Sequence, residues 1–105
     1  MDKLVQIITA MGIPFAYDHF AEGEAVDPPF ICYLLPNSDN FAADGRVYFK
    51  ANEVHIELYT DTKDLSVEQK VEAVLDEHGI YYDRSEVWIE SEKLYEVLYT
   101  FEMEA

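Results

Sequence analysis

The chain predicts a two-layer α+β domain in which two helices cover one face of a mixed, mostly antiparallel sheet. Residues 53–60 and 95–103 alternate apolar and polar side chains with a period of two, which is typical of half-buried strands. Residues 2–11 and 66–78 space their apolar residues as an amphipathic helix does. A length of 105 residues fits one domain, so we expect the order α-β-β-β-β-α-β-β in a single unit over residues 1–105.

The first helix is predicted near the N-terminus. Its apolar face would consist of Leu4, Ile7, Ile8 and Met11. Asp2 suits the N-cap position, and Gly12 followed by Pro14 stops the helix. Polar residues interrupt the apolar stretch and Asp2 offsets Lys3, so we do not expect a signal peptide, and no stretch has membrane-spanning length.

Short strands are expected next. Residues 13–20 have an extended pattern, residues 21–29 form a connection rich in turn residues, and residues 30–35 form a nearly all-apolar strand. Cys32 lies in this apolar run, which favours a buried, unreactive thiol over a nucleophile. As the only cysteine it can form no internal disulfide, which favours a reducing compartment.

A loop and a hairpin are predicted before the central strand. Residues 37–45 are expected to form a loop, because turn-forming residues dominate them. Residues 46–49 would then pair with the strand that starts at Glu53, with residues 50–52 as the turn.

The central strand and the last two strands should share one buried face. In the central strand the core positions are Val54, Ile56 and Leu58, and the opposite face carries His55, Glu57 and Tyr59. A strand over residues 86–90 and another over residues 95–103 would be joined by a turn at residues 91–93. Their outward positions mix polar residues with Leu98, which fits either a contact with a neighbouring subunit or ordinary scattered exposure.

The second helix is predicted to start at Ser66, where Ser66 and Gln69 match a capping box, and to end at Gly79 in the left-handed conformation. Its apolar face would consist of Val67, Val71, Val74, Leu75 and His78. The acidic residues expected to lie away from that face are Glu68, Glu72, Asp76 and Glu77.

The charge balance limits the classes of molecule that the chain is expected to bind. The 22 acidic and 7 basic residues give a formal net charge of −15 at pH 7. Such a field repels phosphate backbones, so we expect no nucleic-acid binding through a basic surface. Three interpretations stay open, namely solubility, a partner with a basic surface, and a surface that must not retain passing DNA.

No catalytic, cofactor or metal site is expected. None of the histidines, His19, His55 and His78, has a second ligand at a zinc-site spacing. The four glycines are isolated and cannot form a phosphate-binding loop, and no nucleophile accompanies the Asp18-His19 pair. The chain is therefore not expected to be an enzyme.

Several strings resemble the small tail-completion and tail-terminator proteins, which join heads to tails in long-tailed bacteriophages and prophages. They are ICYLLP (31–36), NFAADG (40–45), VHIELYT (54–60), KD (63–64), VE (71–72) and SEKLYEVLY (91–99). The resemblance implies a subunit that forms a homo-oligomeric ring, often a hexamer, at the head-proximal end of the tail tube. Such a ring ends tube growth and contacts the tail tube protein and a head connector or stopper protein.

The same resemblance implies a protein of the virion tail, assembled in the bacterial host cytoplasm, with no membrane partner. DNA would pass through the ring without specific binding, and carboxylates could line that passage. The family supplies no catalytic residues. A rival hypothesis from the charge alone is an acidic inhibitor that mimics DNA and occupies the basic groove of a nucleic-acid enzyme.

Four residues are candidate contacts with other subunits, because aromatic residues and arginine are frequent at interface hot spots. They are Phe41, in the loop 37–44, together with Arg46, Arg84 and Trp88. Each also has a purely structural interpretation. Phe41 would fold into the core, Trp88 would be half-buried on its strand, and both arginines would pair with nearby acids.

Overall fold

The computed structural model describes residues 2–21, 23–37, 41–43, 46–49 and 51–104, without the side chains of residues 2, 41–43 and 46–49. The two helices are α1 (Asp2–Ala10) and α2 (Leu65–Glu77). The strands are β1 (Phe15–Tyr17), β2 (Phe30–Leu34), β3 (Phe41–Ala43), β4 (Arg46–Phe49), β5 (Ala51–Thr60), β6 (Asp83–Ile89) and β7 (Leu94–Glu104).

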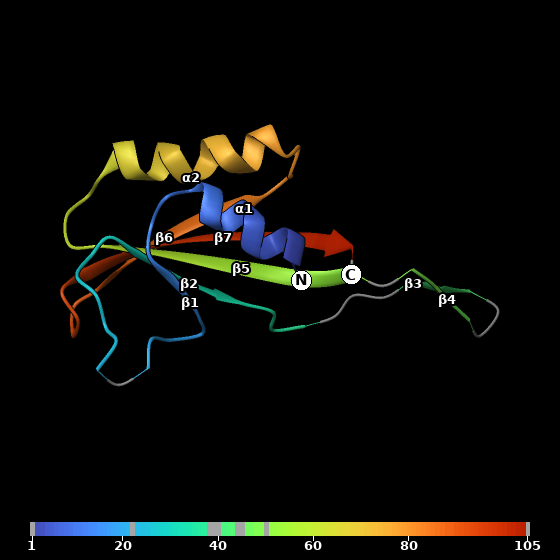
Figure 1. Ribbon diagram of the computed structural model, residues 1–105, viewed down its shortest axis with the longest axis horizontal. Helices are drawn as coiled ribbons and strands as arrows, with labels where there is room; N and C mark the ends of the chain where they lie inside the picture. Colours follow the sequence, from blue (N-terminus) through green and yellow to red (C-terminus); the bar gives the residue numbers. More distant parts are fainter. Residues whose placement is uncertain (1, 22, 38–40, 44–45, 50, 105) are drawn as a thin grey trace.

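Five strands form the main sheet in the order β1-β2-β5-β7-β6 (Figure 1). β1 and β2 are parallel, and the other neighbouring pairs are antiparallel. Both helices lie on one face of this sheet (Figure 1). The predicted α+β architecture, with a mixed and mostly antiparallel sheet, is therefore confirmed.

The core lies between the helices and the sheet. Val54, Ile56 and Leu58 of β5 are fully buried, as the alternation predicts. The other buried apolar residues come mainly from α1, α2 and β7, and they include Leu4, Ile7, Ile8, Val71, Leu75, Val97 and Tyr99. Burying a large apolar side chain contributes about 1.5–3 kcal/mol, so this layer supplies most of the stabilisation. Neither described helix is long and apolar enough to cross a membrane.

The start of α2 differs from the prediction. The helix begins at Leu65, and Asp64 is its N-cap, because the Asp64 carboxylate accepts a hydrogen bond from the Val67 backbone N–H at 3.2 Å. The Ser66 hydroxyl donates to the same carboxylate at 2.7 Å. The predicted capping box at Ser66 is wrong, since a carboxylate two residues earlier fills that role. Gly79 does adopt the left-handed conformation, with φ +67°.

Two side chains of α2 also lie elsewhere than predicted. Glu68, expected to face solvent, is buried with 3% of its surface exposed. His78, expected on the apolar face, is exposed at the C-cap, where its Nδ1 lies 2.9 Å from the Val74 carbonyl oxygen. A buried carboxylate must be paired, and the partners of Glu68 come from outside the helix.

The segment before β5 is a second correction. Residues 41–43, predicted as loop, form β3, which pairs with β4 in the register Phe41 with Phe49 and Ala43 with Arg46. β4 therefore pairs with β3 rather than with β5, and the predicted hairpin is wrong. Ala51 and Asn52, predicted as a turn, belong to β5 and pair with Glu104 and Met103. Residues 38–40, 44–45 and 50 of these predictions lie outside the described residues.

Candidate functional site

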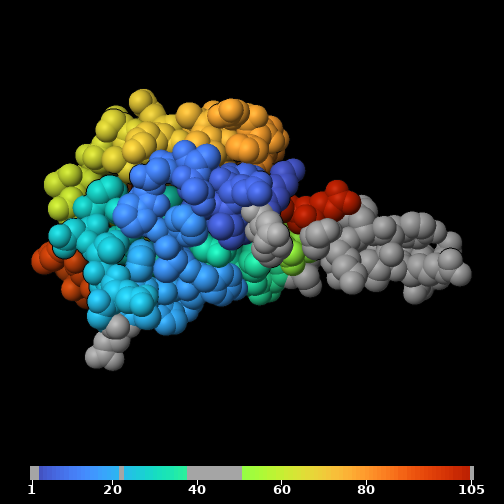
Figure 2. All heavy atoms as spheres, in the orientation of Figure 1, coloured from blue at the N-terminus to red at the C-terminus, as the bar shows by residue number. Residues whose placement is uncertain are grey.

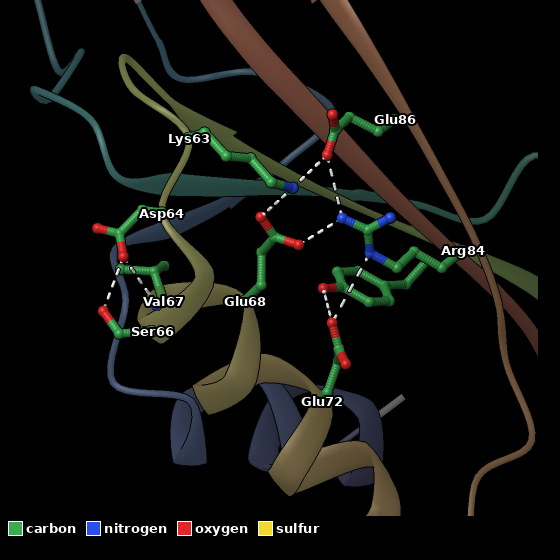
Figure 3. A network of polar contacts seen from close by, with 9 residues as sticks. Lys63, Asp64, Ser66, Val67, Glu68, Glu72, Arg84 and Glu86 are labelled. Carbon is green, nitrogen blue, oxygen red and sulfur yellow. Dashed lines mark hydrogen bonds and ion pairs between the residues drawn. The ribbon is translucent and has the colours of Figure 1, made fainter.

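An ion-pair network surrounds Glu68 between α2 and the edge strand β6. Its carboxylate accepts from Lys63 Nζ at 2.6 Å and from the Arg84 guanidinium. Glu86 joins the same two cations, binding Lys63 and lying 3.1 Å from Arg84. Figure 3 shows the Glu68 carboxylate between Lys63, which precedes α2, and Arg84 on β6. The network thus fastens the start of α2 to the edge strand.

Tyr99 and Glu72 extend this network towards the core. The Tyr99 hydroxyl donates to the Glu72 carboxylate at 2.8 Å, and the Arg84 Nε lies 3.8 Å from the same carboxylate. The hydrogen bond that Arg84 donates to Glu68, with a smaller contribution from Glu86, raises the pKa of Arg84 above its ordinary value. The hydrogen bond from Lys63 lowers the pKa of the Glu86 carboxyl. Each carboxylate of this network therefore has a cation within 4 Å.

The opposite face of the sheet, which we call the outer face, has a different charge pattern. Among the outward positions of β5, β6 and β7 none is a lysine or an arginine. The carboxylates at those positions are Glu53, Glu57, Asp83, Glu96, Glu102 and Glu104. Glu53 is bound by Asn37 at 2.9 Å and by His55 Nε2 at 3.0 Å. The lysine and arginine side chains that the structure describes lie on the helix side or in turns.

The centre of the outer face is a carboxylate, tyrosine, carboxylate row. The Tyr59 hydroxyl lies 3.0 Å from Glu57 Oε1 and 2.8 Å from Glu96 Oε2, but a phenol has one proton to donate. Partial burial is the largest cause that raises the pKa of Glu57, and the Glu96 charge adds to it. Burial and the hydrogen bond to Glu96 raise the pKa of Tyr59 as well. Glu57 and Tyr59 therefore hold their protons more tightly than isolated groups would.

Cys32 lies beside this row and is chemically quiet. The thiol is buried, as predicted, with 5% of the residue exposed. Burial, followed by the charge of Glu57, raises its pKa to about 11. A thiol with so high a pKa is almost wholly protonated near pH 7, so the nucleophile that the sequence disfavours is disfavoured here too.

Of the four candidate contact residues, the structure describes the side chains of Arg84 and Trp88. Arg84 is engaged within its own subunit by the network above, which fits its structural interpretation. Trp88 is 40% exposed, its ring packs on Tyr95 at a centroid distance of 4.7 Å, and its Nε1 donates to Glu90 at 2.6 Å. The side chains of Phe41 and Arg46 lie outside those that the structure describes.

Sequence reasoning missed the β3–β4 ribbon, the two-stranded sheet that Phe41–Ala43 and Arg46–Phe49 form. It projects past the end of the five-stranded sheet (Figure 1), and the molecule measures 49 × 30 × 24 Å. A two-stranded hairpin without a hydrophobic layer is marginally stable in water. The signal in the sequence was the period of two in residues 46–49, which is short and easily assigned to the wrong hairpin.

A cleft of about 570 Å³ lies at the same end of the molecule as the ribbon. Its walls are the start of α1, the turn after α2, and residues 100–104 of β7. Figure 2 shows the end of β7 (red) beside the start of α1 (blue). Tyr81, one of the lining residues, is 90% exposed, which is unusual for a large aromatic residue.

The described residues contain no group of three or more His, Cys, Asp or Glu side chains placed to hold a metal ion. Neither a scan against protein-family models nor a search of curated proteins finds a match to this chain. What the arrangement offers is two surfaces, an outer face without lysine or arginine and a ribbon with a neighbouring cleft.

Proposed function

We propose that this chain is a structural subunit of a phage or prophage tail. It assembles with copies of itself into a ring at the head-proximal end of the tail tube, ends tube growth, and contacts the tail tube protein and the head connector or stopper. The observation that carries the proposal is the β3–β4 ribbon, which projects from the sheet. A protein that worked alone would gain little from such an element.

The ribbon supports assembly for an energetic reason. Two paired strands of three and four residues form few hydrogen bonds and, by themselves, are only marginally stable. Packing against another subunit would supply the missing apolar burial, at about 25 cal/mol per Å². Projecting ribbons are therefore suited to joining subunits.

The charge of the outer face supports the part of the proposal in which DNA passes through the ring. Its six outward carboxylates and its lack of outward lysine or arginine on β5, β6 and β7 make it a repulsive surface for phosphates. A ring that turned these faces inward would let DNA slide without binding it. If replacing these carboxylates by neutral residues left DNA passage and infectivity unchanged, this part of the proposal would fail.

Electron microscopy of the purified protein, alone and mixed with tail tubes, tests the proposal. We expect rings alone, and tubes that stop at a cap when the protein is present. The matched control replaces residues 41–49 by a short Gly-Ser turn, which removes the ribbon and leaves the five-stranded sheet. That variant should fold and cap no tubes. Uncapped tubes with the wild-type protein would contradict the proposal.

The second candidate is an acidic inhibitor that mimics DNA, and the outer face is the observation that favours it. Such a protein would be a stable monomer or dimer and would form a salt-sensitive complex with a restriction or repair enzyme. The double variant Glu57→Gln, Glu96→Gln should weaken that complex, whereas removal of the ribbon should leave it intact. The two variants thus separate the candidates, because tail assembly depends on the ribbon.

A further inference from the structure

We propose that two copies of this chain pair along the edge strand β6, with the two β6 strands antiparallel and a two-fold axis between the two Val87 residues. The partner is a second copy of the chain, and the two five-stranded sheets continue into one another. The inference goes beyond the proposed function, because it concerns a pair of copies and does not use the ribbon.

The two edges of the main sheet differ in length and protection. β1 has three residues and is followed directly by Asp18 in the left-handed conformation, with φ +65°. β6 has seven residues, contains neither proline nor lysine, and pairs with β7 without a register shift. Short strands, proline, lysine and bulges are the features that stop an edge from pairing with another chain. β6 therefore lacks the usual protection of a sheet edge.

The backbone of β6 is open to a further strand. Among the strands that the structure describes, β7 is the only neighbour of β6. None of the backbone hydrogen bonds found among the described residues joins residues 83–88 to a segment other than β7. Six of the seven residues of β6 are exposed. The backbone N–H and C=O groups on the side away from β7 can therefore pair with a second strand.

Two large apolar side chains are exposed in the second half of this edge strand. Val87 is 51% exposed on the outer face, and Trp88 is exposed on the helix side. A second copy laid against β6 would cover both side chains, and apolar burial contributes about 25 cal/mol per Å². Backbone hydrogen bonds and apolar burial would thus stabilise the same contact.

The charges around β6 make it a favourable place for two acidic copies to meet. Copies with a formal net charge of −15 each repel one another, most strongly where their carboxylates lack cations. Glu86 is held by Lys63 and Arg84, and Glu90, just after β6, is held by Lys93. The outward positions of β5, β6 and β7 on the outer face carry no lysine or arginine. Repulsion is therefore weaker along the β6 edge than across the outer face.

The order of charges along β6 selects the register of the pair. With the axis at Val87, the residue opposite Glu86 is Trp88 of the second copy. Arg84 lies opposite Glu90, so no two like charges face each other along the strands. An axis at Glu86 would set two carboxylates against each other, and an axis at Trp88 would set Glu86 against Glu90. An axis nearer the start of β6 would pair fewer residues, so Val87 is the centre.

A single cysteine at the axis tests the pairing directly. In an antiparallel pair the Cα atoms of opposite residues lie about 4.5–5.5 Å apart, which is within the range of a disulfide. Mild oxidation of the variant Val87→Cys should therefore give a product of twice the subunit mass in a denaturing gel without reductant. Cys32 is buried, so it contributes little background.

The matched control is Ser85→Cys, which places the cysteine on the same face of the same exposed strand. In the proposed register the two Ser85 positions are about four residues, or about 14 Å, apart along the strands, too far for a disulfide. This variant should form at least about tenfold less linked product than Val87→Cys. Equal yields from the two variants would indicate random collision and would overturn the inference.

A second cysteine should restore the link in that control. Ser85 lies opposite Ile89 in the proposed register, so the variant Ser85→Cys, Ile89→Cys should be joined between chains. Within one chain these two positions are also about 14 Å apart, which prevents an internal link. Absence of the linked product, in a variant that circular dichroism shows to be folded, overturns the register and with it the inference.

A charge placed at the axis should separate the copies. Adding Val87→Lys to the double-cysteine variant sets two lysines against each other and should lower the linked fraction at least about tenfold. Adding Val26→Lys instead makes the same change of net charge at another exposed valine, in the connection before β2. This control should leave the linked fraction unchanged. An equal loss in both variants would mean that net charge alone governs the contact and would overturn the inference.

Failure of the inference is distinguishable from failure of the proposed function. Linked pairs from a protein that caps no tail tubes would contradict the function and leave the inference intact. Tubes capped by a protein whose Val87→Cys variant stays unlinked would contradict the inference alone.

Discussion

The carboxylates on the two faces of the sheet have different partners. On the helix side, Glu68 is buried and held by Lys63 and Arg84, and Glu86 shares the same cations. On the outer face, Glu57 and Glu96 flank a tyrosine hydroxyl, and the outward positions of β5, β6 and β7 include no lysine or arginine. The pKa of Glu86 is lowered by its hydrogen bond with Lys63, and that of Glu57 is raised by burial.

The difference distinguishes charges that stabilise the fold from charges that do not. Arg84 and Lys63 lie where a carboxylate is buried between α2 and β6, and they neutralise it. At the centre of the outer face, Glu57 and Glu96 share a tyrosine hydroxyl instead of a cation, and the repulsion between the two carboxylates lowers the stability of the folded chain. In the functions proposed above, this acidic surface would exclude DNA or bind a basic partner.

The largest effect is expected from Arg84→Met, which removes the main partner of a buried carboxylate. Breaking a buried pair costs about 3–5 kcal/mol, and the partial exposure of Arg84 together with the remaining Lys63 reduces this to about 2 kcal/mol. Urea denaturation measures it. Lys93→Met is the control, because the Lys93–Glu90 pair is exposed and should contribute at most about 0.5 kcal/mol. Equal losses of stability in the two variants would mean that the network around Glu68 stabilises the fold no more than an exposed ion pair does.

A middle-sized effect is expected from Tyr59→Phe, at about 1 kcal/mol near pH 7. The change leaves Glu57 and Glu96 facing each other without their shared donor. Tyr99→Phe on the helix side also removes a hydrogen bond to a carboxylate, but Glu72 keeps Arg84 nearby. Thermal unfolding at pH 7 and pH 4 should show that the Tyr59→Phe cost shrinks on acidification more than the Tyr99→Phe cost does.

The smallest effect is expected from Glu57→Gln, below about 1 kcal/mol. Because the folded-state pKa of Glu57 is raised, the native chain binds this proton more tightly than the unfolded chain does. Stability from this group is therefore full below the ordinary carboxyl pKa of about 4.3 and is lost as pH rises through the folded value. The variant should be more stable than wild type at pH 7 and equal to it at low pH.

Glu86→Gln should change the stability at pH 7 in the direction opposite to Glu57→Gln. It therefore tests whether the two faces of the sheet differ. The pKa of Glu86 is lowered in the folded state, so its contribution is present above the ordinary carboxyl pKa and is lost as pH falls through the folded value. The variant should be less stable than wild type at pH 7. Denaturation curves at several pH values measure both substitutions, and shifts of the same sign would show that the two faces do not differ.

Local signals in the sequence predicted most of the fold. The alternation in residues 53–60 and the apolar spacing in α1 correspond to buried side chains such as Ile56 and Ile7. The capping box failed because the Asp64 carboxylate caps the helix two residues earlier, at the Val67 backbone N–H, and a two-residue shift cannot be decided from composition. The hairpin at residues 46–49 failed because pairing depends on which strand is nearby in space.

The sequence by itself determined the α+β class, the two helices, the strand faces and the acidic character, because these follow from periodicity and composition within short windows. The three-dimensional fold was needed to see that Arg84 meets Glu68, that six outward carboxylates share one face, and that the ribbon lies at the same end as the cleft. Each of these joins residues distant in the chain, and local propensity carries no information about which distant segments meet.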